Sequence, residues 1–189
     1  TVRIKHPVYA VLMQGEDQDF ADEILEYGVD KIFIYNHKDL NHFNVERYTN
    51  VMEDFINKIK PTAILYGGTS LGRSFAPRVA ARFKTGLTAD CTMLDMKENT
   101  DLVQIRPAFG GNIMATILCP EHRPQMGTVR PAVFKKPTSD TIKKGQIIRV
   151  DMEVKQQDIR TRLVEVVKTS KENIKLEDVL WFHYRGTYW

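Results

Sequence analysis

The sequence predicts an α/β domain with a mainly parallel sheet and an antiparallel strand extension in its second half. Three observations lead to this prediction. Strand-like apolar runs alternate with amphipathic helical runs in the first half of the chain, which is the pattern of parallel α/β sheets. One of these strands runs directly into a glycine-rich loop and a helix. From Leu87 onward the strand-like segments are broken by glycine and proline, which favours antiparallel pairing.

The first half begins with two strand–helix pairs. Both strands are short apolar runs, and both helices show apolar residues at helical spacing. Each helix also has a sequence signal at one end. Gly28 favours the turn that ends the first helix, and Asn44 can cap the start of the second. In order, the predicted elements are a strand at Val8–Met13, an acidic helix at Asp17–Tyr27 ended by Gly28, a strand at Lys31–Tyr35, and a helix from the Asn44 cap to Ile59.

A third strand at Ala63–Tyr66 leads into the loop Gly67–Gly72 and a helix that ends near Phe83. Free backbone N–H groups at such a loop can hold a phosphate. The loop matches neither the dinucleotide fingerprint nor the phosphate-binding loop of nucleotide hydrolases. A tight turn with close helix–strand packing is therefore the preferred interpretation. Arg73, in the first turn of the helix, is well placed to reach an anion or a partner carboxylate.

The second half is predicted to form strands with surface loops between them. Asp90 is expected to orient a backbone group or an arginine, and Cys91 to be a buried structural thiol rather than a nucleophile. Arg106 shortly precedes a Gly-Gly-Asn turn, so its guanidinium cation and the N–H donors of the turn can lie on the same edge of the domain. The predicted segments are strands at Leu87–Asp95, Leu102–Pro107, Ile113–Cys119 and Met126–Pro131, a surface loop at Val133–Gly145, a strand at Gln146–Val154, and an amphipathic segment at Asp158–Ser170 before Leu176–Val179.

Composition excludes several classes of function. The chain has 189 residues, an apolar fraction of 42% and a net charge of +3 with dispersed lysines and arginines, so one globular domain without nucleic-acid binding is indicated. Two cysteines and five scattered histidines give no metal-site spacing, and no serine, cysteine or histidine constellation indicates a catalytic nucleophile. No apolar run reaches the roughly 20 residues that span a bilayer. We therefore expect a cytoplasmic protein with no metal site, no membrane span and no enzymatic activity of its own.

Four segments in a fixed order resemble the successive motifs of the electron-transfer flavoprotein alpha family. The similarity covers roughly Val8 to Asp178, and the wording of the third motif looks most like members from anaerobic bacteria. The segments are PTAILYGGTSLGRSFAPRVAAR at residues 61–82, GLTADCT at 86–92, RPAFGGN at 106–112 and PQMGTVRP at 124–131.

This resemblance implies a Rossmann-like three-layer α/β/α domain that packs against a beta subunit in a heterodimer. It implies an N-terminal domain over residues 1–154, followed at 155–189 by a linker and an atypical tail in place of the C-terminal domain that chiefly holds FAD in the family. Family members usually open with a further strand, so we expect two sheet edges to lack a partner. The implied partners are the beta subunit and, through the complex, an acyl-CoA or related dehydrogenase.

The resemblance implies a docking and scaffold role in which the domain helps to position FAD within the complete heterodimer. The residues predicted to line that side of the domain are Gly68, Thr69, Arg73, Arg106, Gly111 and Asn112. Two alternatives remain open at this point. The chain can be a free-standing adenine-nucleotide-binding domain of the universal-stress type, with the nucleotide on the Gly67–Gly72 loop, or a truncated fragment without function.

Overall fold

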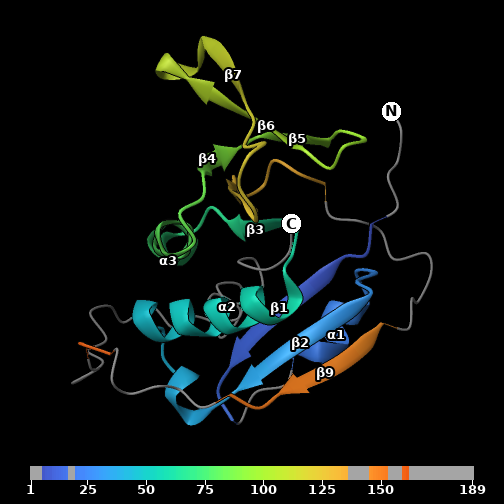
Figure 1. Cartoon of the computed structure of the whole chain (residues 1–189), viewed down its shortest axis with the longest axis vertical. Helices are drawn as coiled ribbons and strands as arrows, with labels where there is room; N and C mark the ends of the chain where they lie inside the picture. Colours follow the sequence, from blue (N-terminus) through green and yellow to red (C-terminus); the bar gives the residue numbers. More distant parts are fainter. Residues whose placement is uncertain (1–5, 17–19, 136–144, 153–158, 162–189) are drawn as a thin grey trace, which may run out of the picture.

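The computed structural model describes residues 6–16, 20–135, 145–152 and 159–161. Within these ranges two parallel three-stranded sheets and one antiparallel sheet are present, with helices packed on the parallel sheets (Figure 1). The strands are β1 Tyr9–Gln14, β2 Lys31–Asn36, β3 Ala63–Gly67, β4 Leu87–Cys91, β5 Met93–Met96, β6 Leu102–Ala108, β7 Ile113–Ile117, β8 Gln125–Val129 and β9 Gln146–Val150. The helices are α1 Ala21–Leu25, α2 Val45–Ile59 and α3 Ser70–Arg82, with short 3-10 turns η1 Lys38–Leu40 and η2 Phe109–Gly111.

The first sheet has the order β1-β2-β9 and is covered on both faces. Alternate residues of a strand point to opposite faces, so the apolar runs of β1 and β2 supply two cores. Ala10, Leu12, Ile32 and Ile34 pack with α1 in one cluster. The other face of the same strands packs against α2 and α3 in a larger cluster that includes Phe33. This arrangement confirms the predicted α/β/α layering.

The second sheet has the order β3-β8-β4, and all three strands are parallel. Its central strand, β8, is buried along its whole length. Helix α3 packs against this sheet and against α2, so it joins the two sheets into one core. Among the described residues, β1 and β9 are the edge strands of the first sheet, and β3 and β4 are those of the second.

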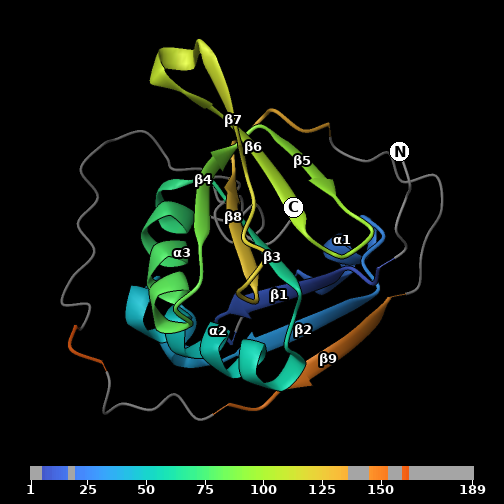
Figure 2. The same cartoon turned by 45° about the horizontal axis from the view of Figure 1, so that its top comes forward.

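The antiparallel extension consists of β5, β6 and β7 and projects from the second sheet (Figure 2). The prediction of antiparallel strands is confirmed for these three. It is wrong for Leu87–Cys91 and for the strand at Met126–Pro131, which pair in parallel as β4 and β8. Two neighbouring parallel strands need a long connection between them, and β5, β6 and β7 form the connection between β4 and β8. We call residues 93–117 the arm.

Most element boundaries agree with the sequence. Asn44 caps α2 as predicted: its Oδ1 accepts from the N–H groups of Glu46 at 3.0 Å and Arg47 at 3.1 Å. The first helix is shorter than Asp17–Tyr27; it occupies Ala21–Leu25 and is followed by a turn to Gly28 at φ +75°, while residues 17–19 lie outside the described residues.

Three further predictions are corrected or fall outside the described ranges. Helix α3 begins at Ser70, so the glycine loop is shorter than Gly67–Gly72. The last strand ends at Val150 rather than Val154. Most of the predicted loop at Val133–Gly145, and most of the segments at Asp158–Ser170 and Leu176–Val179, lie outside the described residues.

Candidate functional site

The candidate site lies at the carboxyl end of the second sheet, where β3 turns into α3. Thr69 caps this helix, its hydroxyl oxygen accepting from the Gly72 N–H at 3.2 Å. The Gly68 N–H donates to the Val129 carbonyl at 2.7 Å, and a Cβ on Gly68 would stand 2.7 Å from the same oxygen. A Cβ on Gly72 would stand 1.8 Å from the Gly67 carbonyl oxygen. Close packing of strand and helix therefore accounts for these glycines.

Asp90 is held at the centre of the site by an unusual backbone conformation. It has φ +64°, and the β4–β8 register shifts between Thr88 and Cys91 on either side of it. Aspartate tolerates this left-handed region better than most residues. The Asp90 N–H donates to the Thr128 hydroxyl on β8 at 2.8 Å. The irregularity turns the carboxylate out of the strand and toward the ends of β3 and β8.

Two arginines from different elements bind the Asp90 carboxylate. Arg73 of α3 donates from Nη2 to Oδ1 at 3.2 Å, and Arg130, just after β8, donates from Nε to Oδ2 at 3.1 Å and also from Nη2. Arg73 is additionally held by its Nε, which donates to the Gly68 carbonyl at 2.9 Å. The expectation that Asp90 orients an arginine is confirmed.

The site carries more positive than negative charge. The hydrogen bond from Arg130 lowers the pKa of Asp90, with further lowering by the charges of Arg130, Arg73 and Arg106. Two guanidinium groups therefore bind the carboxylate, and the Arg106 guanidinium acts on it through its charge alone. The Arg73 and Arg130 side chains are 58% and 42% exposed, and Arg106 donates from Nε to the Pro107 carbonyl at 3.3 Å. We call Arg73, Arg106 and Arg130 with Asp90 the arginine rim; it is suited to an anion presented from outside the domain.

The six predicted site residues divide into two groups. Gly68, Thr69 and Arg73 lie together at the arginine rim, and Arg106 on β6 is close enough to act on Asp90 electrostatically. Gly111 and Asn112 instead lie at the tip of the arm, where β6 turns into β7 through η2. Gly110 and Gly111 have φ values of +71° and +94°, so this turn requires glycine for its backbone shape.

Arg130 is the site residue that the sequence prediction missed. Its motif, residues 124–131, was recognised, but nothing in it distinguishes this arginine from a surface cation. Its role depends on the parallel pairing of β8 with β4, which brings it beside Asp90 from 40 residues away.

Several other predictions concern groups outside the rim. Cys91 is buried, as predicted, and burial raises the pKa of its thiol to about 11, which disfavours the nucleophilic thiolate form. Among the described residues, no three His, Cys, Asp or Glu side chains form a group that could hold a metal. In the same part of the chain, none of the helices has the length and apolar character needed to cross a membrane.

The Electron transfer flavoprotein domain family model matches residues 2–155. Over 168 residues the chain is 55% identical to the lactate dehydrogenase (NAD(+),ferredoxin) subunit LctC of Acetobacterium woodii, covering 89% of this chain and 40% of that protein. It is 42% identical over 171 residues to the electron transfer flavoprotein subunit alpha of Thermoanaerobacterium thermosaccharolyticum, covering 90% and 52%. Protein FixB of Clostridium saccharobutylicum is 44% identical over 168 residues, with 88% and 50% covered.

The chain spans about half the length of the curated relatives it matches. The comparisons do not favour the adenine-nucleotide-binding or fragment alternatives, and the packing roles of Gly68 and Gly72 agree with that. The division of the chain at residue 154 remains a prediction. The family match and the identities together show that the chain belongs to the electron transfer flavoprotein family, as an N-terminal domain of the alpha-subunit type.

Proposed function

We propose that the chain is the docking and scaffold domain of an electron transfer flavoprotein alpha subunit. It pairs with a beta subunit and positions FAD for electron transfer, without holding the cofactor tightly or catalysing a reaction itself. The observation that supports this proposal is the position of the arginine rim at the base of an uncovered apolar arm. The arm offers a surface for a partner, and the rim offers cations for an anionic group that the partner carries.

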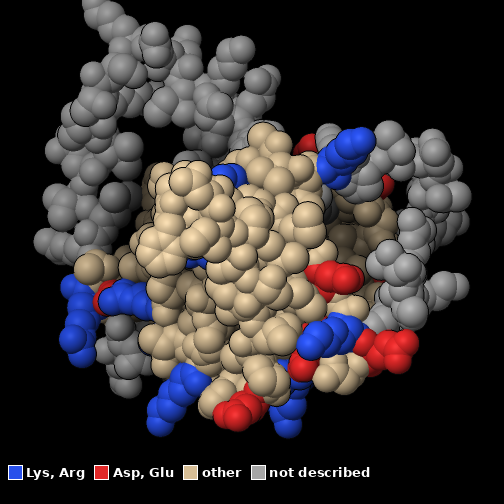
Figure 3. Space-filling view, turned by 90° about the horizontal axis from the view of Figure 1, so that it is seen from above, with Lys and Arg blue, Asp and Glu red and all other residues tan. Residues whose placement is uncertain are grey.

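The arm exposes apolar side chains that the domain itself does not cover. Phe109 is 85% exposed, and Ile113 and Met114 on β7 are 53% and 52% exposed. Successive residues of a strand point to opposite faces, so β7 is open on both sides. Figure 3 shows that the face seen from above is mostly uncharged, with charged side chains gathered around its border. Exposed apolar surface of this kind marks protein contacts.

The chemistry of the arginine rim fits the edge of a flavin. A reduced flavin is anionic, and a fixed cation nearby stabilises the reduced form and raises its potential. Arg106 is the best candidate for this role, because within the described residues its Nε–Pro107 hydrogen bond leaves the Nη groups available. Arg73 and Arg130 are held in place by Asp90 and define the shape of the rim.

The electron source of the complete complex belongs to the same proposal. One relative is a subunit of a lactate dehydrogenase, and another, from Anaerotignum propionicum, is an acryloyl-CoA reductase electron transfer subunit. We infer that an acyl-CoA or related dehydrogenase exchanges electrons with the complex, and that the complex works in the cytoplasm of an anaerobic bacterium.

The first test is co-purification with the cognate beta subunit, with absorbance spectra of the complex and of the isolated chain. We expect a yellow complex and a colourless isolated chain. No complex, or flavin bound to the isolated chain, contradicts the proposal. In the complex, Arg106→Ala should lower the flavin potential in a redox titration, while Arg82→Ala, on the last turn of α3, should leave it unchanged. Equal potentials in wild type and Arg106→Ala exclude the role of this arginine.

A further inference from the structure

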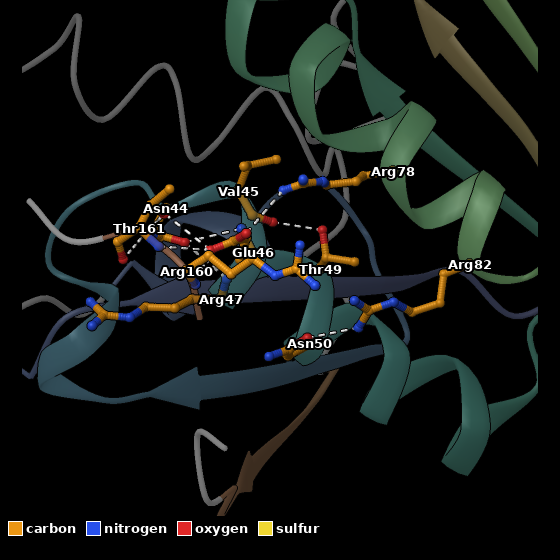
Figure 4. Close-up of polar contacts among 10 residues, drawn as sticks. All are labelled: Asn44, Val45, Glu46, Arg47, Thr49, Asn50, Arg78, Arg82, Arg160 and Thr161. Atoms are coloured by element: carbon orange, nitrogen blue, oxygen red, sulfur yellow. Dashed lines mark hydrogen bonds and ion pairs between the residues drawn. The ribbon is translucent and has the colours of Figure 1, made fainter. Parts of the chain in front are cut away.

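A second polar cluster lies at the start of α2, away from the arginine rim. There a short piece of the chain, residues 159–161, lies against the first helical turn (Figure 4). This piece follows β9, which ends at Val150 on the outer edge of the first sheet. Arg160 and Thr161 are held at the start of α2 by hydrogen bonds to Asn44 and Glu46.

The Glu46 carboxylate binds the backbone of this piece. Its Oε2 accepts from the N–H of Arg160 at 2.8 Å and from the N–H of Thr161 at 3.2 Å. The Thr161 hydroxyl also donates to Oε2, at 3.1 Å. Two successive backbone donors and a hydroxyl therefore share one carboxylate oxygen. Charge-assisted hydrogen bonds of this type are stronger than those between neutral groups.

Asn44 completes the binding from the other side. Its Oδ1 is occupied as the cap of α2, so the orientation of the amide group is fixed. Its Nδ2 consequently faces Thr161 and donates to the hydroxyl oxygen at 2.9 Å and to the carbonyl oxygen at 3.4 Å. The Thr161 hydroxyl can donate to Glu46 and accept from Asn44 at once, which satisfies its hydrogen-bonding capacity. Serine or threonine is the residue type that fits this position.

Electrostatics favour an ionised Glu46 in this place. The hydrogen bond from the Arg160 backbone lowers the pKa of Glu46, and the bonds from Thr161 and the charge of Arg78 lower it further. Glu46 also lies in the first turn of α2, where the helix dipole favours a negative charge. Its Oε1 is 3.8 Å from Arg78 Nη1 on α3, and its side chain is only 13% exposed. The carboxylate thus joins α2, α3 and the bound segment.

We propose that Asn44 and Glu46 form a binding site for an extended peptide, with residues 160 and 161 of the same chain as its occupant. The site recognises two consecutive backbone N–H groups of the peptide and a hydroxyl group on the second of these residues. The site holds residues 160 and 161 at the start of α2, where Glu46 also pairs with Arg78 of α3. This inference does not depend on the proposed docking role, because it uses none of the residues of the arm or the rim.

Hydrogen exchange at the Arg160 and Thr161 amides tests the site directly in the full chain. Glu46→Ala removes the acceptor, and we expect both amides to exchange about tenfold faster. Glu46→Gln keeps an acceptor without the charge, so about threefold faster exchange is expected. Glu53→Gln is the matched control: Glu53 is on the same helix and pairs with Arg82 of α3, as Glu46 pairs with Arg78. Its exchange rates should equal those of the wild type.

Thr161→Val supplies a variant that leaves the folded body untouched. It removes the hydroxyl that bridges Glu46 and Asn44 but keeps both backbone donors, so a smaller acceleration, about threefold, is expected. Thermal unfolding of each variant shows whether the body remains folded. Unchanged exchange in Glu46→Ala and Thr161→Val overturns the proposal. Equal acceleration in Glu53→Gln also overturns it, because the effect would then come from general loosening of α2.

Discussion

The first sheet and the arm use similar apolar residues in opposite ways. In the sheet, Ile32 and Ile34 are fully buried, and helices cover both faces (Figure 1). In the arm, Phe109 and Ile113 are mostly exposed, and the β6–β7 end extends beyond the rest of the domain (Figure 2). Isoleucine at position 34 is therefore part of the core, whereas isoleucine at position 113 contributes little to it.

The difference separates a region that stabilises the fold from a region that, under the proposed function, contacts a partner. Burial of apolar surface stabilises a fold only where water is removed from it. The fold nevertheless requires the arm, because the arm connects the parallel strands β4 and β8. Phe109, Ile113 and Met114 of the arm are exposed, and under the proposed function the beta subunit covers them. Replacing an isoleucine by alanine should therefore lower the free energy of unfolding in the first sheet, and weaken partner binding in the arm.

The largest effect on stability is expected for Ile34→Ala. The side chain is fully buried in the cluster between the first sheet and α1, and loss of a buried isoleucine typically costs 2–5 kcal/mol, about 3 kcal/mol here. Urea unfolding measures the change in the free energy of unfolding. Ile147→Ala in β9 is a matched control, because Ile147 belongs to the same sheet but is 37% exposed. If both variants unfold at the same urea concentration, the two-sided core of the first sheet does not exist as described.

An intermediate effect is expected for Asp90→Asn, at the point where the parallel sheet meets the arm. Asparagine tolerates φ +64°, so the substitution removes the charge and leaves the backbone conformation accessible. We expect a loss of about 1 kcal/mol at pH 7, at the low end for charge-assisted hydrogen bonds, because the two arginines are partly exposed.

The pH dependence of this loss has a definite sign. The folded-state pKa of Asp90 is lowered, so its ionisation stabilises the fold above the ordinary value of 3.8, and this contribution disappears as the pH falls through the folded-state value. The urea midpoints of wild type and Asp90→Asn should therefore differ at pH 7 and approach each other below pH 3.8. A difference that stays constant down to pH 3 would show that the arginine contacts do not depend on the charge.

The first half of the fold could be predicted from the sequence because its signals are local. Helical spacing and a cap at Asn44 located α2 correctly, and short apolar runs located β1 and β2. The pairing of β4 and β8 could not be predicted in this way. Both strands are short: β4 follows Gly86, and β8 lies between Pro124 and Pro131. Parallel pairing becomes favourable only through the burial of β8 between β3 and β4, which no local pattern reveals.

The same limit applies to the candidate site. The loop at Gly68 and the first-turn position of Arg73 are local features, and the structure brings these residues together. Arg130 depends on the long-range pairing of β8, so its motif alone did not identify it. Gly111 and Asn112 stand close to Arg106 in sequence, but a strand of the arm separates them from the rim because β6 is extended. Their proposed contact with the partner remains a prediction.

The smallest effect on stability, and the largest on partner binding, is expected at the tip of the arm. Ile113→Ala repeats the substitution of Ile34 at a side chain that is 53% exposed, so the free energy of unfolding should change by no more than about 0.5 kcal/mol. Phe109→Asn removes an aromatic side chain that is 85% exposed and introduces a residue that tolerates φ +47°. If the arm docks on the beta subunit, each substitution should weaken the complex about tenfold or more, because buried aromatic and aliphatic anchors dominate interfaces. Calorimetric titration of beta subunit into each variant measures this loss. Wild-type affinity in both variants would mean that the partner binds elsewhere, and the exposed apolar surface of the arm would need a different explanation.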